Sequence, residues 1–179
     1  MRTTVLAAML VVVAFGLVGC GSGIPSWYPN APQDPLYLRS ANSATSQDMQ
    51  VAIDKASTGA RAELGRMLET KVNALQKKFE DETGVGQEAT LLAQFTQATK
   101  LVVSTTMNGS KMKDQKTFKE GDLYRAFVMM ELPIGSANET LLQEIKNNKD
   151  LYTRFRASET FKELDAEVQK YEQFKKEMK

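Results

Sequence analysis

Apolar side chains recur at two different spacings along the chain, and the spacing changes near residue 108. Before that point they return every three or four residues, which is the period of an amphipathic helix. One such stretch runs from Met49 to a stop at Gly84, and Thr45 with Asp48 predicts a capping box at its start. Its apolar positions are Met49, Ile53, Ala56, Ala60, Leu64, Met67, Val72, Leu75 and Phe79.

A second helix is expected from about Gln87 to Thr105, with Leu91, Phe95, Ala98 and Val102 on one face. Its β-branched end, residues 102–106, is also typical of a strand, so its boundary stays open there. Beyond it the period falls to two. Residues 110–119 and 123–132 flank Glu120-Gly121-Asp122, which predicts a β-hairpin.

The two arms of this hairpin differ in character. The second arm has apolar residues on both faces, which predicts a central strand. The first arm predicts an edge strand, because lysines protect an edge from pairing with other chains; a basic binding face is the sharper alternative. These lysines are Lys111, Lys113, Lys116 and Lys119. A further strand is expected at residues 36–41, after Pro35.

The last part of the chain predicts two more helices. Ser136 with Glu139 indicates a capping box for a short helix that Asn147-Asn148 ends, and Asp150 can cap a final helix toward Lys179. The apolar seam of that final helix is narrow and the rest is charged, so it either folds back on its own domain or packs on a partner, as in a coiled coil. Phe161, Leu164, Val168 and Tyr171 are its predicted assembly contacts.

Together these elements predict an α+β fold, in which a small antiparallel sheet packs on long amphipathic helices and a C-terminal helix follows. The expected organisation is a leader at 1–19, a tether at 20–35, an α+β domain at 36–147 and a C-terminal amphipathic helix at 148–179. The chain after the leader is long enough for one domain with a modest core.

The start of the chain has the layout of a secretory signal peptide. Arg2 precedes an uncharged apolar run of about 14 residues, whereas a membrane-spanning helix needs roughly 20. Leu17-Val18-Gly19-Cys20 closes this run and resembles the lipobox of bacterial lipoproteins, in which a signal peptidase recognises the residues before Cys and lipid is attached to its thiol. An ordinary signal peptide with an incidental Cys is the alternative. In the lipoprotein class, the absence of Asp after the lipidated Cys favours the outer membrane, and Gly21 follows here.

The tether that follows is rich in proline and flexible at its start. Pro25, Pro29, Pro32 and Pro35 keep it extended, with a reach of roughly 50 Å at about 3.3 Å per residue. Trp27-Tyr28 lies within it. We expect the pair either to dock the tether against the folded domain or to sit at the lipid headgroup boundary.

Composition removes several classes of function. Arg2 is the only charged residue before Cys20, so the mature chain has 22 basic and 22 acidic residues and a net charge of zero, which argues against nucleic-acid binding. The chain has no histidine, and its one cysteine is assigned to lipid. The chain therefore lacks the residues needed for a histidine-dependent triad, for a Cys/His zinc site and for thiol catalysis. We expect no enzyme, no catalytic residues, no metal and no cofactor. Glu63, Asp122 and the hydroxyls of residues 104–106 show no catalytic spacing.

Three motifs in order give a family resemblance. They are Pro25-Ser26-Trp27, Ala60-Arg61-Ala62-Glu63-Leu64 and Gly121-Asp122-Leu123-Tyr124-Arg125-Ala126-Phe127-Val128. From about residue 25 to residue 132 the chain resembles the Lpp-twenty family of bacterial surface lipoproteins, and within it the flagellar outer-membrane members. Ser26 stands where the family usually has an acidic residue.

The resemblance implies a small α+β domain, no known catalysis, and self-assembly into rings or disks around the flagellar motor. The expected function is therefore a structural role in the envelope for an outer-membrane lipoprotein, anchored by lipid, facing the periplasm, and bound to its own copies or to envelope and flagellar proteins. A general surface or envelope lipoprotein without a motor role is the first alternative. A small-ligand binder or enzyme is the second.

Overall fold

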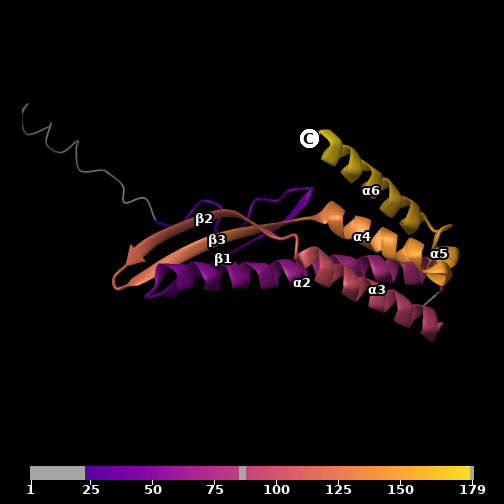
Figure 1. Cartoon of the computed structure of the whole chain (residues 1–179), viewed down its shortest axis with the longest axis horizontal. Helices are drawn as coiled ribbons and strands as arrows, with labels where there is room; N and C mark the ends of the chain where they lie inside the picture. Colours follow the sequence, from indigo (N-terminus) through magenta and orange to yellow (C-terminus); the bar gives the residue numbers. More distant parts are fainter. Residues whose placement is uncertain (1–22, 85–87, 178–179) are drawn as a thin grey trace, which may run out of the picture.

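The computed structural model describes residues 23–84 and 88–177. The predicted α+β fold with helices at its C-terminal end is confirmed (Figure 1). Along the chain the elements are β1 (Tyr37–Ser46), α2 (Met49–Thr83), α3 (Ala89–Met107), β2 (Lys111–Glu120), β3 (Leu123–Pro133), α4 (Ile134–Asn147), α5 (Lys149–Phe155) and α6 (Glu159–Glu177).

The sheet has the order β1-β3-β2, and both pairings are antiparallel. The predicted hairpin and its central second arm are therefore confirmed, as is the position of the lysine-bearing strand at an edge. Gly121 has a φ of 61° at the first of the two turn positions, where a residue without Cβ is favoured. The strand β1 is longer than expected, because its polar second half also pairs with β3.

The helix α2 runs along one face of the sheet, against β1 and β3 (Figure 1). The side chain of Asp48 accepts a hydrogen bond of 3.0 Å from the backbone N–H of Val51, and the helix ends before Gly84, whose φ is 66°. The predicted capping box is wrong: Thr45, its expected N-cap, pairs with Arg125 within the sheet, and Asp48, its expected third helical residue, is itself the N-cap. Strand pairing thus holds Thr45 away from the helix start.

Small residues in the first half of α2 let its backbone lie close to β1. A Cβ on Gly59 would lie 2.8 Å from Cγ of Asn42, whereas a Cβ on Gly65 would meet nothing within 4 Å. At the neighbouring residue, the hydroxyl of Ser40 donates a hydrogen bond of 2.6 Å to the carbonyl oxygen of Ala60.

These two glycines give a matched stability test. We expect Gly65→Ala to raise the free energy of unfolding by up to about 1 kcal/mol, because Ala is the better helix former. Gly59→Ala should give a smaller gain or none, because its Cβ forces the side-chain amide of Asn42 to shift. Urea unfolding of both variants measures the difference. Equal shifts in the same direction would contradict the close approach.

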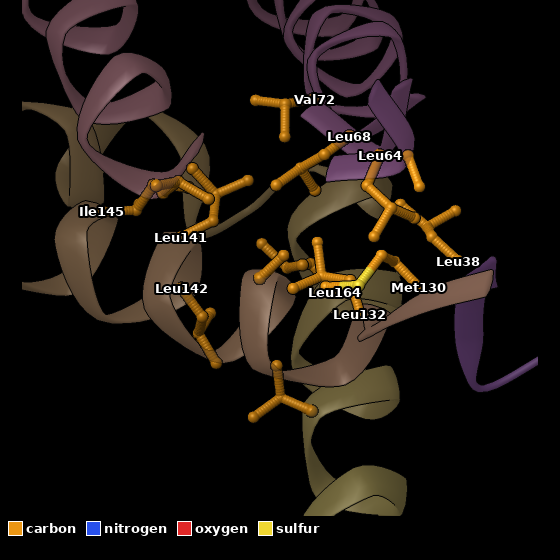
Figure 2. Close-up of a cluster of buried hydrophobic side chains, with 14 of the residues drawn as sticks. Leu38, Leu64, Leu68, Val72, Met130, Leu132, Leu141, Leu142, Ile145 and Leu164 are labelled. Atoms are coloured by element: carbon orange, nitrogen blue, oxygen red, sulfur yellow. The ribbon is translucent and has the colours of Figure 1, made fainter. Parts of the chain in front are cut away.

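Behind the sheet, side chains from α2, β3, α4 and α6 form one continuous core. Figure 2 shows leucines of α2 facing Met130 and Leu132 of β3, with α4 and α6 closing the cluster. At the far end of α2, the rings of Phe79, Phe95 and Phe155 pack together, with centroids 4.7 to 5.4 Å apart. The core therefore extends along the whole length of α2.

The structure resolves the boundaries of the two middle helices. α3 stays helical to Met107, so the strand alternative for residues 102–106 is wrong. α4 begins at Ile134, directly after β3, and the predicted capping box of Ser136 and Glu139 is also wrong. The Ser136 hydroxyl donates a 2.9 Å hydrogen bond back to the carbonyl of Pro133, while Glu139 pairs with Lys175. Ser136 therefore lies in the first turn of a helix that has already started.

The single C-terminal helix predicted for 148–179 is two helices. Asn148, and not Asp150, caps α5, and the Ser158 hydroxyl accepts a 3.1 Å hydrogen bond from the N–H of Phe161 at the start of α6. The two segments 36–147 and 148–177 share one hydrophobic cluster. They are therefore parts of one folded unit.

The predicted assembly contacts on α6 are corrected by their burial. Three of them lie within the chain's own core, against α4 and α2, and Tyr171 packs over Gly135 at the start of α4. The apolar stripe of α6 is thus already covered, and the alternative in which this helix folds back on its own domain holds in the structure. The three buried residues are Phe161, Leu164 and Val168.

A carboxylate links the end of α2 to the start of α6. Glu82 accepts hydrogen bonds from the hydroxyl of Thr160 and from its backbone N–H, the latter at 3.2 Å. These bonds hold the pKa of Glu82 below its ordinary value of 4.5.

The lowered pKa makes this link sensitive to acid. Its contribution to stability is complete above about pH 4.5 and is lost as pH falls through the lower folded pKa. We expect Glu82→Gln to destabilise the protein at pH 7, with the difference from the parent shrinking below about pH 4.5. Urea unfolding at several pH values measures this, with Glu69→Gln as the exposed control. A difference that stays constant down to pH 3 would rule out the carboxylate as its source.

Candidate functional site

The candidate anchoring site begins outside the described residues. Leu17, Val18, Gly19 and Cys20, the predicted site of lipid attachment, all fall within residues 1–22, and the described chain starts at Gly23. The tether can be followed from that residue. Residues 23–36 run across the face of the sheet opposite α2, which we call the outer face (Figure 1, indigo). The central strand β3 is therefore covered on both faces, by α2 on one and by the tether on the other.

Gly23 and Pro25 lie directly on this outer face. A Cβ on Gly23 would stand 2.8 Å from the ring of Phe118, so the backbone lies against that ring. Pro25 is buried, and its carbonyl accepts a hydrogen bond of 3.0 Å from the N–H of Tyr28, which closes a turn. The start of the described chain is thus fixed to the hairpin.

Tyr28 provides the aromatic contact that holds the tether. Its ring meets Phe127 edge to face with the centroids 4.8 Å apart, and Phe127 stacks on Phe118 at 5.8 Å. Its hydroxyl accepts a hydrogen bond of 3.1 Å from the hydroxyl of Ser43. Trp27 is half buried beside it. Of the predicted docking pair, Tyr28 is the residue whose ring reaches the sheet aromatics.

The other end of the tether is held by ionic and backbone contacts. The guanidinium of Arg39 lies 2.8 Å from the carboxylate of Asp34 and 3.3 Å from that of Glu131. All three side chains are less than a quarter exposed, so these pairs are screened less than surface pairs. The carbonyl of Leu36 also accepts a 2.9 Å hydrogen bond from the N–H of Ile134. The tether is therefore fixed at both ends of the sheet.

Docking of Tyr28 gives a graded test. Tyr28→Phe removes only the hydrogen bond from Ser43, so it should lower the stability of the docked tether by about 0.5–1.5 kcal/mol. Tyr28→Ala also removes the ring contact with Phe127, so we expect faster hydrogen exchange of the amide at position 28 than in Tyr28→Phe. Exchange followed by mass spectrometry of tether peptides measures both. Equal exchange in the two variants would show that the ring does not hold the tether.

The other residues considered for chemistry are scattered. Glu63 pairs with Arg66 on the surface of α2, Asp122 lies in the hairpin turn, and the Ser104 hydroxyl donates a 3.0 Å hydrogen bond to the carbonyl of Leu101. Within residues 23–84 and 88–177, no group of three or more His, Cys, Asp or Glu side chains is placed to hold a metal ion.

Hollows lie between the helices at the surface of the molecule. One hollow of about 260 Å³ lies between α2 and α3, lined by polar residues such as Asn73 and Gln76. A second of about 270 Å³ lies between α2, α4 and α6. Among the described residues, every helix is too short or too polar to cross a bilayer.

No family model matches the chain, and no curated protein matches it. The resemblance to the Lpp-twenty family therefore stays a prediction from the quoted motifs.

Sequence reasoning located the tether and its aromatic pair, but it missed the partners on the sheet. Phe127 and Met129 are buried on the outer face, where α2 cannot reach them. The available signal was the second apolar face of β3, which has to be covered by some part of the chain. The sequence pattern does not indicate that the tether is the segment that covers this face of β3.

Proposed function

We propose that this chain is a bacterial lipoprotein, anchored through Cys20 at the outer membrane and facing the periplasm, with a structural role in the envelope and no catalysis. The observation that carries the proposal is the lipobox, Leu17-Val18-Gly19-Cys20, which contains the only cysteine of the chain. A thiol lipidated by diacylglycerol, together with an acylated amine, gives three acyl chains. One acyl chain binds a membrane only marginally, whereas several hold a protein there stably.

The docked tether supports an anchoring role. A free tether would allow the domain to move up to roughly 50 Å from the membrane. Gly23 lies against Phe118, and Cys20 precedes Gly23 by three residues in the sequence. At about 3.3 Å per residue, these three steps span roughly 10 Å. The domain is thus held close to the lipid, as a fixed component of the envelope requires.

Assembly contacts, in this proposal, lie away from α6. The edge strand β2 leaves its outer backbone groups unpaired within the described chain, and its side chains are mostly exposed. Because its lysines oppose pairing with another strand, a partner would contact the exposed side chains of β2. We assign it as the first contact candidate for a homo-oligomer or an envelope partner.

The resemblance makes a ring or disk of the flagellar basal body the specific setting. A deletion strain tests it. In the proposed role, the strain swims poorly and images of its motors lack a density that returns with the complementing gene. Normal swimming with complete motors would overturn the flagellar setting and leave the lipoprotein anchor standing. Pull-downs that recover surface or cell-wall components without motor proteins would then favour a general envelope lipoprotein.

A further inference from the structure

The tether enters the fold at one end of the molecule. Gly23 lies on Phe118, and Phe118 is paired with Arg125 close to the turn of the β2–β3 hairpin. The first turn of α2 lies at the same end, since Ser46, just before it, pairs with Tyr124. We call this the hairpin end. Cys20 precedes Gly23 by three residues, so a lipid on Cys20 lies within roughly 10 Å of it.

Exposed apolar side chains gather in the segments that meet there. Ile24 is 50% exposed and Met49 is 48% exposed, and Val51 and Leu123 are also exposed. These four are half of the exposed large apolar side chains in the described chain. Exposed apolar residues grouped on one part of a surface mark interaction sites, including sites for membranes.

We propose that the hairpin end rests in the headgroup layer of the bilayer that holds the lipid anchor, with these apolar side chains at its interface. The inference rests on the proposed lipidation of Cys20. Lys119 lies beside the turn, and its long stem suits an interface where the ammonium stays hydrated while the methylenes meet apolar groups. The acidic Glu120 is paired with Arg125 at 2.7 Å, which offsets its repulsion from lipid phosphates.

The orientation that follows places the other end of the molecule far from the membrane. The helix α2 has 35 residues, which correspond to about 50 Å at 1.5 Å per residue. It begins at the hairpin end and finishes among α3, α5 and α6, where Phe79 contacts Phe155 (Figure 1). The end that carries α5 is therefore offered to partners in the periplasm.

Energy transfer from the protein to the lipid surface tests this orientation. The lipidated full chain with Asp122→Cys, and separately with Asp150→Cys, is labelled with a donor dye and placed in phospholipid vesicles containing headgroup-labelled acceptor lipid. Asp122 is in the hairpin turn and Asp150 in α5, and both are exposed. We expect transfer from position 122 to be several-fold greater than from position 150. Equal or reversed transfer would overturn the orientation.

Controls separate this inference from the lipid anchor itself. The parent protein should float with the vesicles and take up no thiol dye, because a lipidated Cys20 has no free thiol. Failure to float, or labelling of Cys20, would overturn the proposed anchor rather than the orientation alone. A second pair, Gln47→Cys and Lys149→Cys, repeats the comparison at positions with exposed side chains if either first variant misfolds.

The apolar contact has its own test. In the Asp122→Cys background, replacing Val51 and Leu123 with Ser should lower transfer while the protein still floats. Both residues are exposed, so the substitutions leave the core intact. Unchanged transfer would remove the apolar side chains from the proposed contact.

Discussion

Replacing Cys20 with Ala should remove nearly all of the protein from the outer-membrane fraction. The substitution deletes the only thiol in the chain, and with it the proposed thioether to diacylglycerol. Each buried methylene contributes about 0.8 kcal/mol to membrane binding, so losing several acyl chains removes far more binding energy than the apolar side chains of the hairpin end supply. Fractionation followed by immunoblotting measures the distribution.

Ser22→Ala is the matched control, because it alters the tether two residues later and keeps the thiol. It should fractionate like the parent protein. Mass spectrometry of the parent should also show an acylated amino-terminal peptide that begins at Cys20. If Cys20→Ala remains in the outer membrane at the parental level, the lipid anchor is not what holds the protein there.

The largest single loss of stability is expected from Phe79→Ala. Phe79 is fully buried and touches two other rings, with centroid distances of 5.4 Å to Phe95 and 4.7 Å to Phe155. Removing a buried Phe side chain leaves a cavity and costs about 3–5 kcal/mol in the free energy of unfolding. The packing should be disturbed most at the contact between α2 and α5, because the Phe79 ring joins these two helices.

Urea unfolding followed by circular dichroism measures this effect. Leu101→Ala serves as the control, since that side chain is 46% exposed on α3 and its loss should change the free energy of unfolding by only about 0.5 kcal/mol. A similar small change in Phe79→Ala would contradict the ring cluster as the centre of the helical end.

Helices and strands with a regular apolar period could be predicted from the sequence, whereas contacts between distant segments could not. Helical periodicity located α2, and the run from residue 110 to residue 132 identified the hairpin and its central strand. The first predicted capping box is wrong because Thr45 is paired within the sheet. The second is wrong because Ser136 lies inside a helix that begins directly after β3. Local spacing alone contains neither constraint.

The C-terminal region shows the same limit. No Gly or Pro marks the break between α5 and α6, and the break depends on Ser158 capping the second helix. The apolar spacing of α6 is compatible with its own domain and with a partner alike. At the candidate site, the sequence indicated a docked aromatic in the tether, but the choice of Tyr28 as the contact to Phe127 depends on β3 having a second apolar face.

The pairing of the first strand with the central one also bears on when the chain can fold. Leu38 is opposite Leu132, so β1 waits for a partner that is translated more than ninety residues later. Contacts between such distant positions close large loops and slow folding. If the chain is exported as proposed, this topology delays completion of the sheet until β3 has also crossed the membrane.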